Sequence, residues 1–236
     1  MCLSLLALNK ILMYNKIIIA GSSGLVGREL LKLLLESDKI DTVYSLVRKP
    51  SNLEHHKLKE IFFDFEDDSA YKTLPSVGAI FCCLGTTIKI AGSQAAFKKV
   101  DFEYPLLLAK SGLNNGAMAF HVITALGSDE NSSVFYNKVK GQLQEALKKL
   151  NFGQLYIYQP SLLIGDRKEN RPGEKIASLV MPLFEFFMVG PVKKYRSIHV
   201  TAVAKGILVT AENENKKLKI ILSDEIQKLA DSHSNS

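Results

Sequence analysis

The alternation of short apolar runs with longer amphipathic runs is the feature that most restricts the fold of this chain. Runs rich in β-branched and aromatic residues, as expected of strands, occupy positions 16–20, 42–47, 60–65, 79–84, 119–126 and 155–159. Between them, positions 25–36, 101–113 and 136–150 carry apolar residues at three- and four-residue spacing, which is typical of helices that bury one face. This order predicts an α/β architecture in which helices cover both faces of a parallel sheet.

Residues that interrupt or cap helices predict the bounds of the remaining elements. Pro105 is tolerated only near a helix start, so we expect Asp101 to cap that helix and 93–100 to form a separate short helix. A last long helix is expected at 201–212, followed by a strand at 218–222 and a short closing helix.

The length fits one domain. With 236 residues, of which 47% are hydrophobic, the chain has enough apolar surface for one core and is not predominantly disordered. We expect an N-terminal extension at 1–15, a single domain at 16–230 whose substrate region lies mainly at 160–200, and a frayed tail at 231–236.

The charge does not indicate a nucleic-acid partner. Thirty Lys and Arg residues against 24 Asp and Glu residues give a formal net charge of +6. The cations are dispersed, however, and Arg, which reads bases and phosphates best, is scarce. The cysteines Cys2, Cys82 and Cys83 form neither a disulfide framework nor a metal-ligand spacing. No metal is expected, and a reducing, cytoplasmic compartment fits this composition.

The apolar segments do not predict a membrane span. No run of 18 uninterrupted apolar residues exists. The first 13 residues are apolar but lack the features of a signal peptide, and a start at Met13 is an alternative. The apolar run 178–190 fits a pocket-lining or dimer-forming helix better than a weak peripheral membrane contact, which stays open. A monomer and a homodimer are both compatible with the sequence.

The glycine-rich segment after the first strand predicts a phosphate-binding turn. Gly21 suits the tight turn, Gly24 lets the backbone approach a pyrophosphate, and Gly27 allows close packing of helix on strand. The free N–H groups of the helix N-terminus then face the anion. A turn without a ligand is the alternative. The cofactor-binding residues that this motif indicates are Gly21, Gly24 and Gly27.

Strand ends supply further candidates for the nucleotide. Arg48 and Lys49 follow the second strand, where an NAD site would carry a carboxylate for the ribose 2′-hydroxyl, so the sequence favours NADP(H) over NAD(H). Asp64 is a candidate for the adenine amino group, although it also suits a turn. After the fourth strand, the candidates for the nicotinamide ribose are the backbone of Gly85 and the hydroxyl of Thr86.

The candidate catalytic group is Tyr136 with Lys140, one turn apart on one helical face, and Thr124 at the end of the preceding strand. Tyrosine is a weak acid, and a nearby ammonium stabilises its ionised form. Tyr136 would donate a proton to a carbonyl oxygen, Lys140 would also hold ribose hydroxyls, and the Thr124 hydroxyl would polarise the carbonyl. The alternative is a packed tyrosine beside a surface lysine.

Together these residues resemble the atypical short-chain dehydrogenases/reductases, in particular their Tat-interacting-protein-like branch. The matching stretches are Gly21–Gly27, Phe81–Thr87, Val100-Asp101, Phe135-Tyr136, Val139-Lys140-Gly141 and Pro160–Glu174. The resemblance implies a Rossmann-like doubly wound parallel sheet that binds NADP. The residues that it implies near the cofactor are Gly21, Ser23, Gly24, Leu25, Val26, Arg48, Asp64, Leu84, Gly85, Thr86, Tyr136 and Lys140. Two departures stand out: Thr124-Ala125 replaces paired serines, and Gln159 stands where Arg is common.

The leading functional hypothesis is an NADP(H)-dependent oxidoreductase that transfers hydride to or from a small carbonyl or alcohol substrate. The later loops would supply its substrate pocket. The alternative is an NADP-binding regulatory or scaffold protein with little or no turnover, a role also discussed for members of this branch.

Overall fold

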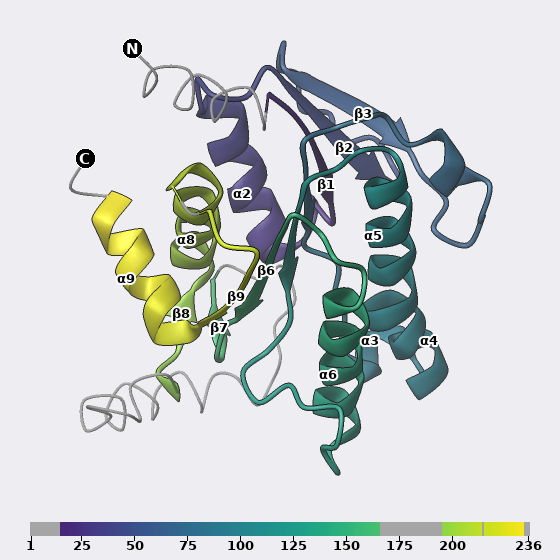
Figure 1. Ribbon diagram of the computed structural model, residues 1–236, viewed down its shortest axis with the longest axis vertical. Coiled ribbons are helices and arrows are strands. Elements are labelled where there is room, and N and C mark those ends of the chain that lie inside the picture. Colours follow the sequence, from purple (N-terminus) through teal and green to yellow (C-terminus); the bar gives the residue numbers. More distant parts are fainter. Residues whose placement is uncertain (1–14, 166–194, 214, 234–236) are drawn as a thin grey trace.

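A computed structural model describes residues 15–165, 195–213 and 215–233. Its centre is a seven-stranded sheet with the order β3-β2-β1-β4-β5-β6-β9, all of whose pairs are parallel (Figure 1). The strands are β1 Lys16–Ala20, β2 Thr42–Val47, β3 Leu58–Phe62, β4 Ala79–Cys82, β5 Ala119–Ile123, β6 Gln154–Gln159 and β9 Leu218–Leu222. The order reverses between β1 and β4, so the sheet is doubly wound, as the sequence predicts.

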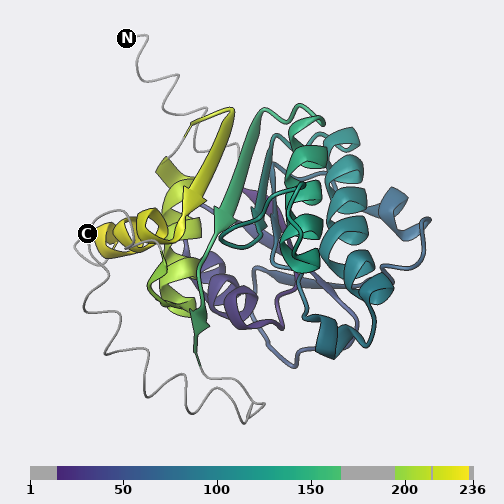
Figure 2. The same ribbon diagram turned by 90° about the horizontal axis from the view of Figure 1, so that it is seen from below.

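Helices cover both faces of the sheet. The long helices are α2 Leu25–Glu36, α5 Tyr104–Asn114, α6 Phe135–Lys148, α8 Val200–Asn213 and α9 Ser223–His233. Figure 2 shows α2, α8 and α9 on one side of the sheet and α5 and α6 on the other. Shorter elements are the 3-10 turn η2 Ala70–Thr73, the helices α3 Ile88–Ala91 and α4 Gln94–Lys98, the π-helical turn η3 Lys99–Glu103, and the parallel pair β7 Leu163–Ile164 with β8 Ile198–His199.

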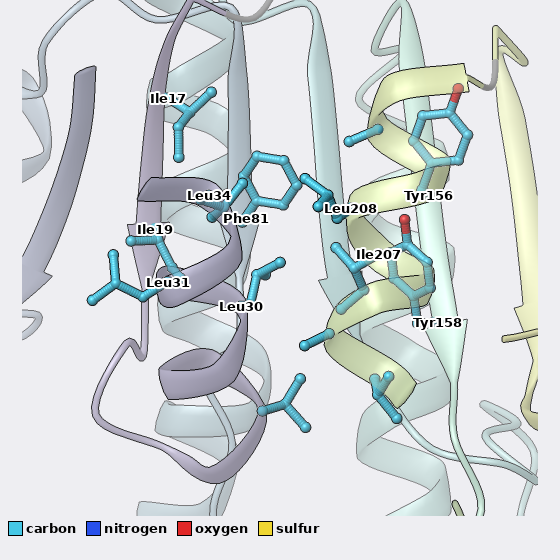
Figure 3. Packing of buried hydrophobic residues seen from close by; sticks show 14 of the residues in the cluster. Ile17, Ile19, Leu30, Leu31, Leu34, Phe81, Tyr156, Tyr158, Ile207 and Leu208 are labelled. Atoms are coloured by element: carbon cyan, nitrogen blue, oxygen red, sulfur yellow. The ribbon is translucent and has the colours of Figure 1, made fainter. Parts of the chain in front are cut away.

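The two helical layers explain why β1 is apolar throughout. Ile17 and Ile19 belong to the cluster that includes α2 and α8 (Figure 3), whereas Ile18 and Ala20 belong to the cluster that includes α5 and α6. All four side chains are fully buried. A central parallel strand that is covered on both faces therefore reads as a continuous apolar run and not as an alternating one.

The predicted strands differ most from the structure at their ends. The third strand, expected at 60–65, lies at Leu58–Phe62, because its pairing with β2 runs from Val43↔Leu58 to Val47↔Phe62. The next residues leave the sheet, and Phe63 and Phe65 join a buried aromatic cluster with Tyr71. Apolar character alone therefore does not mark where the ladder ends.

The prediction that Asp101 caps a helix is wrong. Asp101 lies inside η3, its side chain is buried, and no side-chain cap bond starts α5 at Tyr104. Pro105 lacks the N–H that an α-helix would direct at the carbonyl of Asp101, so the chain passes from α4 into α5 through a π-helical turn. This turn carries Asp101 towards the carboxyl ends of the strands.

Several predicted segments lie outside the described residues. These are the extension 1–14, the larger part of the substrate region at 166–194 with its apolar run 178–190, and the last residues 234–236. The closing helix α9 continues through His233, three residues into the tail for which the sequence predicts fraying. Within the described ranges, no helix is both long and apolar enough to cross a membrane.

Candidate functional site

The candidate residues converge at the carboxyl ends of β1, β2, β4 and β5. The glycine turn follows β1, the pair Arg48 and Lys49 follows β2, the Gly85 loop follows β4, and Thr124 follows β5. Because parallel strands end at a common edge, the topology places these segments around the point where the strand order reverses. Open α/β sheets bind their ligands there.

Two positions of the glycine turn leave no room for a side chain. Gly21 has φ +85°, and a Cβ there would lie 2.6 Å from the carbonyl oxygen of Cys83. A Cβ on Gly27 would lie 2.1 Å from the carbonyl oxygen of Gly21. The Gly24 N–H donates to that same oxygen at 3.0 Å, which closes the turn. The predicted need for glycine at these positions therefore has a steric basis.

The turn leaves the N-terminus of α2 open to an anion. Gly24 is the N-cap, no side-chain hydrogen bond caps the helix, and its first turn carries no acidic residue. Ser23 and Gly24 are exposed, whereas Ser22 is buried and its hydroxyl lies 2.7 Å from that of Ser45 on β2. This serine pair ties the turn to the neighbouring strand. Among the other predicted contacts, Leu25 is half-buried and Val26 packs in the core.

The candidate residues at the strand ends differ in their exposure and in their hydrogen-bond partners within the protein. Arg48 and Lys49 are exposed directly after β2, on the side of the sheet edge next to the glycine turn. The carboxylate of the exposed Asp64 accepts a hydrogen bond from the N–H of Glu66, so it serves a turn. Phe65 is buried and packs against Phe63.

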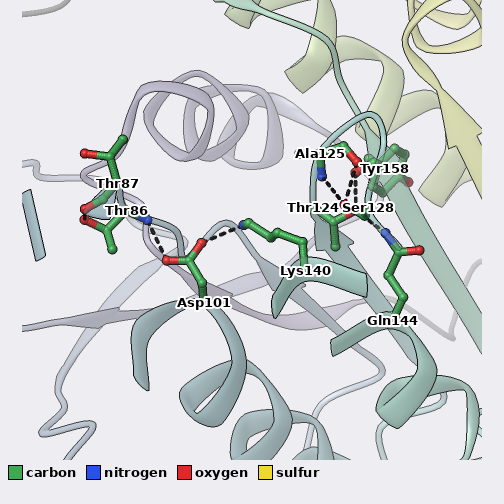
Figure 4. Close-up of polar contacts among 9 residues, drawn as sticks. All are labelled: Thr86, Thr87, Asp101, Thr124, Ala125, Ser128, Lys140, Gln144 and Tyr158. Atoms are coloured by element: carbon green, nitrogen blue, oxygen red, sulfur yellow. Dashed lines mark hydrogen bonds and ion pairs between the residues drawn. The ribbon is translucent and has the colours of Figure 1, made fainter. Parts of the chain in front are cut away.

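A buried ion pair lies beneath the loop after β4. The Asp101 Oδ1 atom is 2.7 Å from Lys140 Nζ, and the other carboxylate oxygen accepts the N–H of Thr86 at 2.9 Å (Figure 4). Asp101 is 1% exposed and Lys140 is 4% exposed. A Cβ at Gly85 would lie 3.5 Å from Asp101 Oδ1 and 3.6 Å from Lys140 Nζ, so this glycine covers the pair with backbone alone.

The predicted pair Tyr136 and Lys140 is brought together. Lys140 Nζ lies 5.9 Å from the centre of the half-buried Tyr136 ring, which packs beside Phe97. Burial lowers the pKa of Lys140, but attraction by Asp101, with smaller contributions from Tyr136 and Cys82, outweighs it, and the net shift is upward. Lys140 is therefore not the surface lysine of the alternative interpretation, but a buried ammonium.

The Thr124 hydroxyl is engaged inside the protein. It donates to the carbonyl of Tyr158 at 3.2 Å and accepts from the side-chain amide of Gln144 at 2.8 Å. Gln144 in turn accepts from the amide of Gln159 at 3.1 Å. Ser128 Oγ, a second hydroxyl at the same strand end, donates to the Ala125 carbonyl at 2.6 Å. Thr124 would have to release Tyr158 to act as a donor to substrate.

Sequence reasoning missed two parts of this arrangement. The sequence predicts that Asp101 caps a helix. The signal that could have pointed to a different role is that Val100-Asp101 is one of the stretches that carry the family resemblance. The sequence shows Gln159 only as a departure from the common Arg and does not reveal its partners, whereas in the structure it is buried and bonded to Gln144 in the Thr124 network. Cys82 is buried under the loop after β4, and this burial raises the pKa of its thiol to about 12.

Comparison with known proteins identifies the family. No family model matches the chain. The protein HTATIP2 of Rattus norvegicus is 34% identical over 172 residues, which are 70% of each chain. The mitochondrial protein FMP52 of Debaryomyces hansenii is 33% identical over 159 residues, 65% of this chain and 69% of the yeast protein. The chain belongs to the atypical short-chain dehydrogenases/reductases, in their Tat-interacting-protein-like branch.

Solved structures of the same fold support the architecture of this short-chain dehydrogenase/reductase. MoeE5 in complex with UDP-glucose and NAD has a TM-score of 0.66 at 12% identity, covering 93% of this chain and 82% of that one. The human epimerase family protein SDR39U1 with NADPH has a TM-score of 0.59 at 16% identity, covering 89% and 77%. At these identities the likeness shows the Rossmann-like fold.

The predicted cytoplasmic compartment is wrong. The FMP52 relatives of Debaryomyces hansenii and Candida albicans are named mitochondrial proteins, and the second matches 91% of this chain at 28% identity. The cysteine pattern on which the prediction rested indicates only that the chain is not a disulfide scaffold. A reducing environment is common to more than one compartment.

Proposed function

We propose that this family member is an NADP(H)-dependent oxidoreductase that interconverts a small carbonyl compound and its alcohol. The observation that carries the proposal is the convergence of the glycine turn, the Gly85 loop and the Tyr136–Lys140 pair at one edge of the sheet, over a buried ion pair. A glycine turn alone would support only a phosphate site. The tyrosine and the charged lysine beside it add acid–base chemistry.

The turn fits a dinucleotide. Side chains are excluded at Gly21 and Gly27 by backbone that approaches within 3 Å of their would-be Cβ atoms. The uncapped first turn of α2 then presents N–H groups and the positive end of the helix dipole. These are the features that a pyrophosphate requires, and they support binding through backbone contacts from Gly21 to Val26, with Gly27 bringing α2 close.

The preference for NADP(H) rests on Arg48 and Lys49. Both cations are exposed at the end of the strand beside the glycine turn, and the hydroxyl contact between Ser22 and Ser45 holds that strand to the turn. A 2′-phosphate would find two positive charges there, whereas a free 2′-hydroxyl would find no carboxylate in its usual place.

The chemistry follows from the residues around Lys140. The bound nicotinamide supplies or accepts the hydride. The Tyr136 hydroxyl exchanges a proton with the substrate oxygen, and the Lys140 ammonium stabilises the ionised tyrosine electrostatically while it holds ribose hydroxyls. The polarising role expected of Thr124 stays a prediction, because its hydroxyl is now bonded to the Tyr158 carbonyl. Ser128 carries the second hydroxyl at the same strand end, so a substitution there is the matched control for a substitution of Thr124.

The nucleotide preference is tested by titrating the protein with NADPH and NADH and following the cofactor's own fluorescence, since the chain has no Trp. NADPH is expected to bind at least about tenfold more tightly, and Arg48→Ala with Lys49→Ala to remove that difference. Lys59→Ala, a cation exposed on the neighbouring strand β3, is the matched control. Tighter binding of NADH would refute the preference.

Turnover is tested with Tyr136→Phe on a panel of small carbonyl compounds. We expect the variant to bind NADPH as the wild type does and to lose on the order of 10²-fold or more in kcat, because the proton donor is gone. Unchanged turnover would refute the role of Tyr136. Cofactor binding by the wild type without turnover of any carbonyl would favour the regulatory protein instead.

The yeast relatives that are named mitochondrial support a mitochondrial location for this chain. Fractionation of cells that express the full chain and a version starting at Met13 would test it. Recovery of both versions outside mitochondria would exclude this location.

A further inference from the structure

The ion pair between Asp101 and Lys140 joins three separate elements. Asp101 lies in η3, Lys140 in α6, and the Thr86 N–H that completes the contact lies in the loop after β4 (Figure 4). Each carboxylate oxygen has its own partner, one the ammonium at 2.7 Å and the other the backbone N–H at 2.9 Å. Asp101 thereby fixes the distance between the lysine and the loop.

Stability alone does not explain such a pair. Two charges removed from water lose hydration that their mutual attraction barely restores, and apolar residues of similar volume commonly serve as well. Here the pair lies almost fully buried beside Tyr136 and beneath Gly85, whose missing side chain would otherwise lie within 3.6 Å of both charged groups. The Lys140 ammonium, which is costly to bury, therefore lies beside Tyr136 and under the loop after β4, where its charge can act on the tyrosine and on a nucleotide.

We propose that Asp101 is the positioning residue for Lys140, and that its carboxylate keeps the ammonium charged and held against the Thr86 loop so that it can contact the nucleotide. The inference rests on the proposed function and adds to it a residue that touches neither cofactor nor substrate. The charged and titratable groups that face Lys140 are Asp101 from η3, Tyr136 from α6 and Cys82 from β4.

Removing the carboxylate changes the balance at Lys140. Asp101→Asn keeps the shape and the acceptor for Thr86 but removes the attraction that opposes burial, and burial favours the neutral amine. Lys140 should then lose its proton at a lower pH than in the wild type. As the pH rises, the nucleotide would then lose its contact with the positively charged form of Lys140.

The first test is the pH dependence of NADPH affinity, measured by cofactor fluorescence between about pH 7 and pH 9. The wild type should bind with nearly constant affinity, and Asp101→Asn should weaken about tenfold over this range. The double variant Asp101→Asn with Lys140→Met should bind weakly but without this dependence. Glu145→Gln, which breaks a partly exposed ion pair with Lys148 on the same helix, is the matched control. A flat profile for Asp101→Asn would overturn the proposal.

The second test needs no nucleotide and separates this inference from the proposed function. In Asp101→Asn the unfolded chain binds a proton at Lys140 that the folded chain releases, so its urea midpoint should recover towards the wild type as the pH rises from about 7 to 9. The double variant should show no recovery. If the recovery occurs but the wild type binds neither nucleotide, the proposed function fails. If the midpoint of Asp101→Asn tracks that of the wild type at every pH, Asp101 does not hold the charge of Lys140.

Discussion

At the scale of single residues, the protein places charged and titratable groups in its interior for two different purposes. Lys140 is buried with a compensating carboxylate, whereas His121 on β5 is buried as a neutral ring. His121 stacks between Phe81 and Tyr156, with ring centroids 4.5 and 4.7 Å away, and its Nδ1 lies 2.9 Å from the Tyr158 hydroxyl. Burial lowers the pKa of His121 to about 3. One group keeps its charge, and the other is prevented from gaining one.

This burial predicts a specific loss of stability in acid. The unfolded His121 takes up a proton near pH 6.5 and the folded one only near pH 3, so its contribution is fully present above pH 6.5 and declines as the pH falls towards 3. Below about pH 6, the wild type should lose about 1.4 kcal/mol per pH unit relative to His121→Phe, which keeps the stacking ring.

Urea unfolding of both proteins at several pH values measures the difference. At neutral pH the variant is expected to be about 1 kcal/mol less stable, because the hydrogen bond between His121 and the Tyr158 hydroxyl is lost. Parallel stability curves for the two proteins would show that His121 titrates normally in the folded state.

At the scale of elements, hydrogen bonds between side chains fix how α6 sits on the sheet. Gln144 on α6 donates to Thr124 after β5 and accepts from Gln159 at the end of β6. All three side chains are buried, so their polar groups need hydrogen-bond partners inside the protein, and Gln144 supplies one to each of the other two. The helix that carries Tyr136 and Lys140 is thereby held in register with two strands.

Replacing the central member of this network should be costly. Gln144→Leu leaves the amide of Gln159 and the hydroxyl of Thr124 each without one buried partner, and we expect a loss of about 1–3 kcal/mol in the free energy of unfolding. Gln142→Leu, on the same helix but half-buried, should change it by no more than about 0.5 kcal/mol. Thermal denaturation of both variants provides the comparison, and equal losses would argue against the network.

The elements also show where prediction from sequence succeeds. The bounds expected for the first, second and last strands and for α2 agree with the structure, because each is an apolar-rich run bounded by polar or glycine residues. The third strand begins two residues earlier than the sequence predicts, because only its pairing with β2 determines where it starts and ends. The π-helical turn around Asp101 was missed, because its cause, the interruption at Pro105, acts four residues away along the chain.

At the scale of the whole molecule, the sheet order separates a central part from two edges. β1, β4 and β5 each pair on both sides and lie between the helical layers, whereas β3 and β9 each pair with one strand of the described sheet. β3 also has no fully buried residue. The site lies at the ends of the central strands, so it is built on the part of the sheet with the most neighbours.

This arrangement predicts a gradient in native-state hydrogen exchange. Amides of β1, β4 and β5 should exchange most slowly, because their release requires opening of both neighbouring strands and the helical layers, and those of β3 and β9 should exchange first. Mass spectrometry of peptides from each strand measures this. Protection of β3 equal to that of β4 would mean that the sheet opens only as a unit.

The sequence by itself determined the α/β class, the glycine turn and the Tyr136–Lys140 pair, because these depend on local periodicity and on residues a few positions apart. The tertiary structure alone decided what those residues touch. It placed Asp101 against Lys140 across 39 positions of the chain, turned the Thr124 hydroxyl towards Tyr158 and Gln144, and buried Gln159 against Gln144. Hydrogen bonds and ion pairs between distant segments depend on the packing of helices against the sheet, which no local pattern encodes.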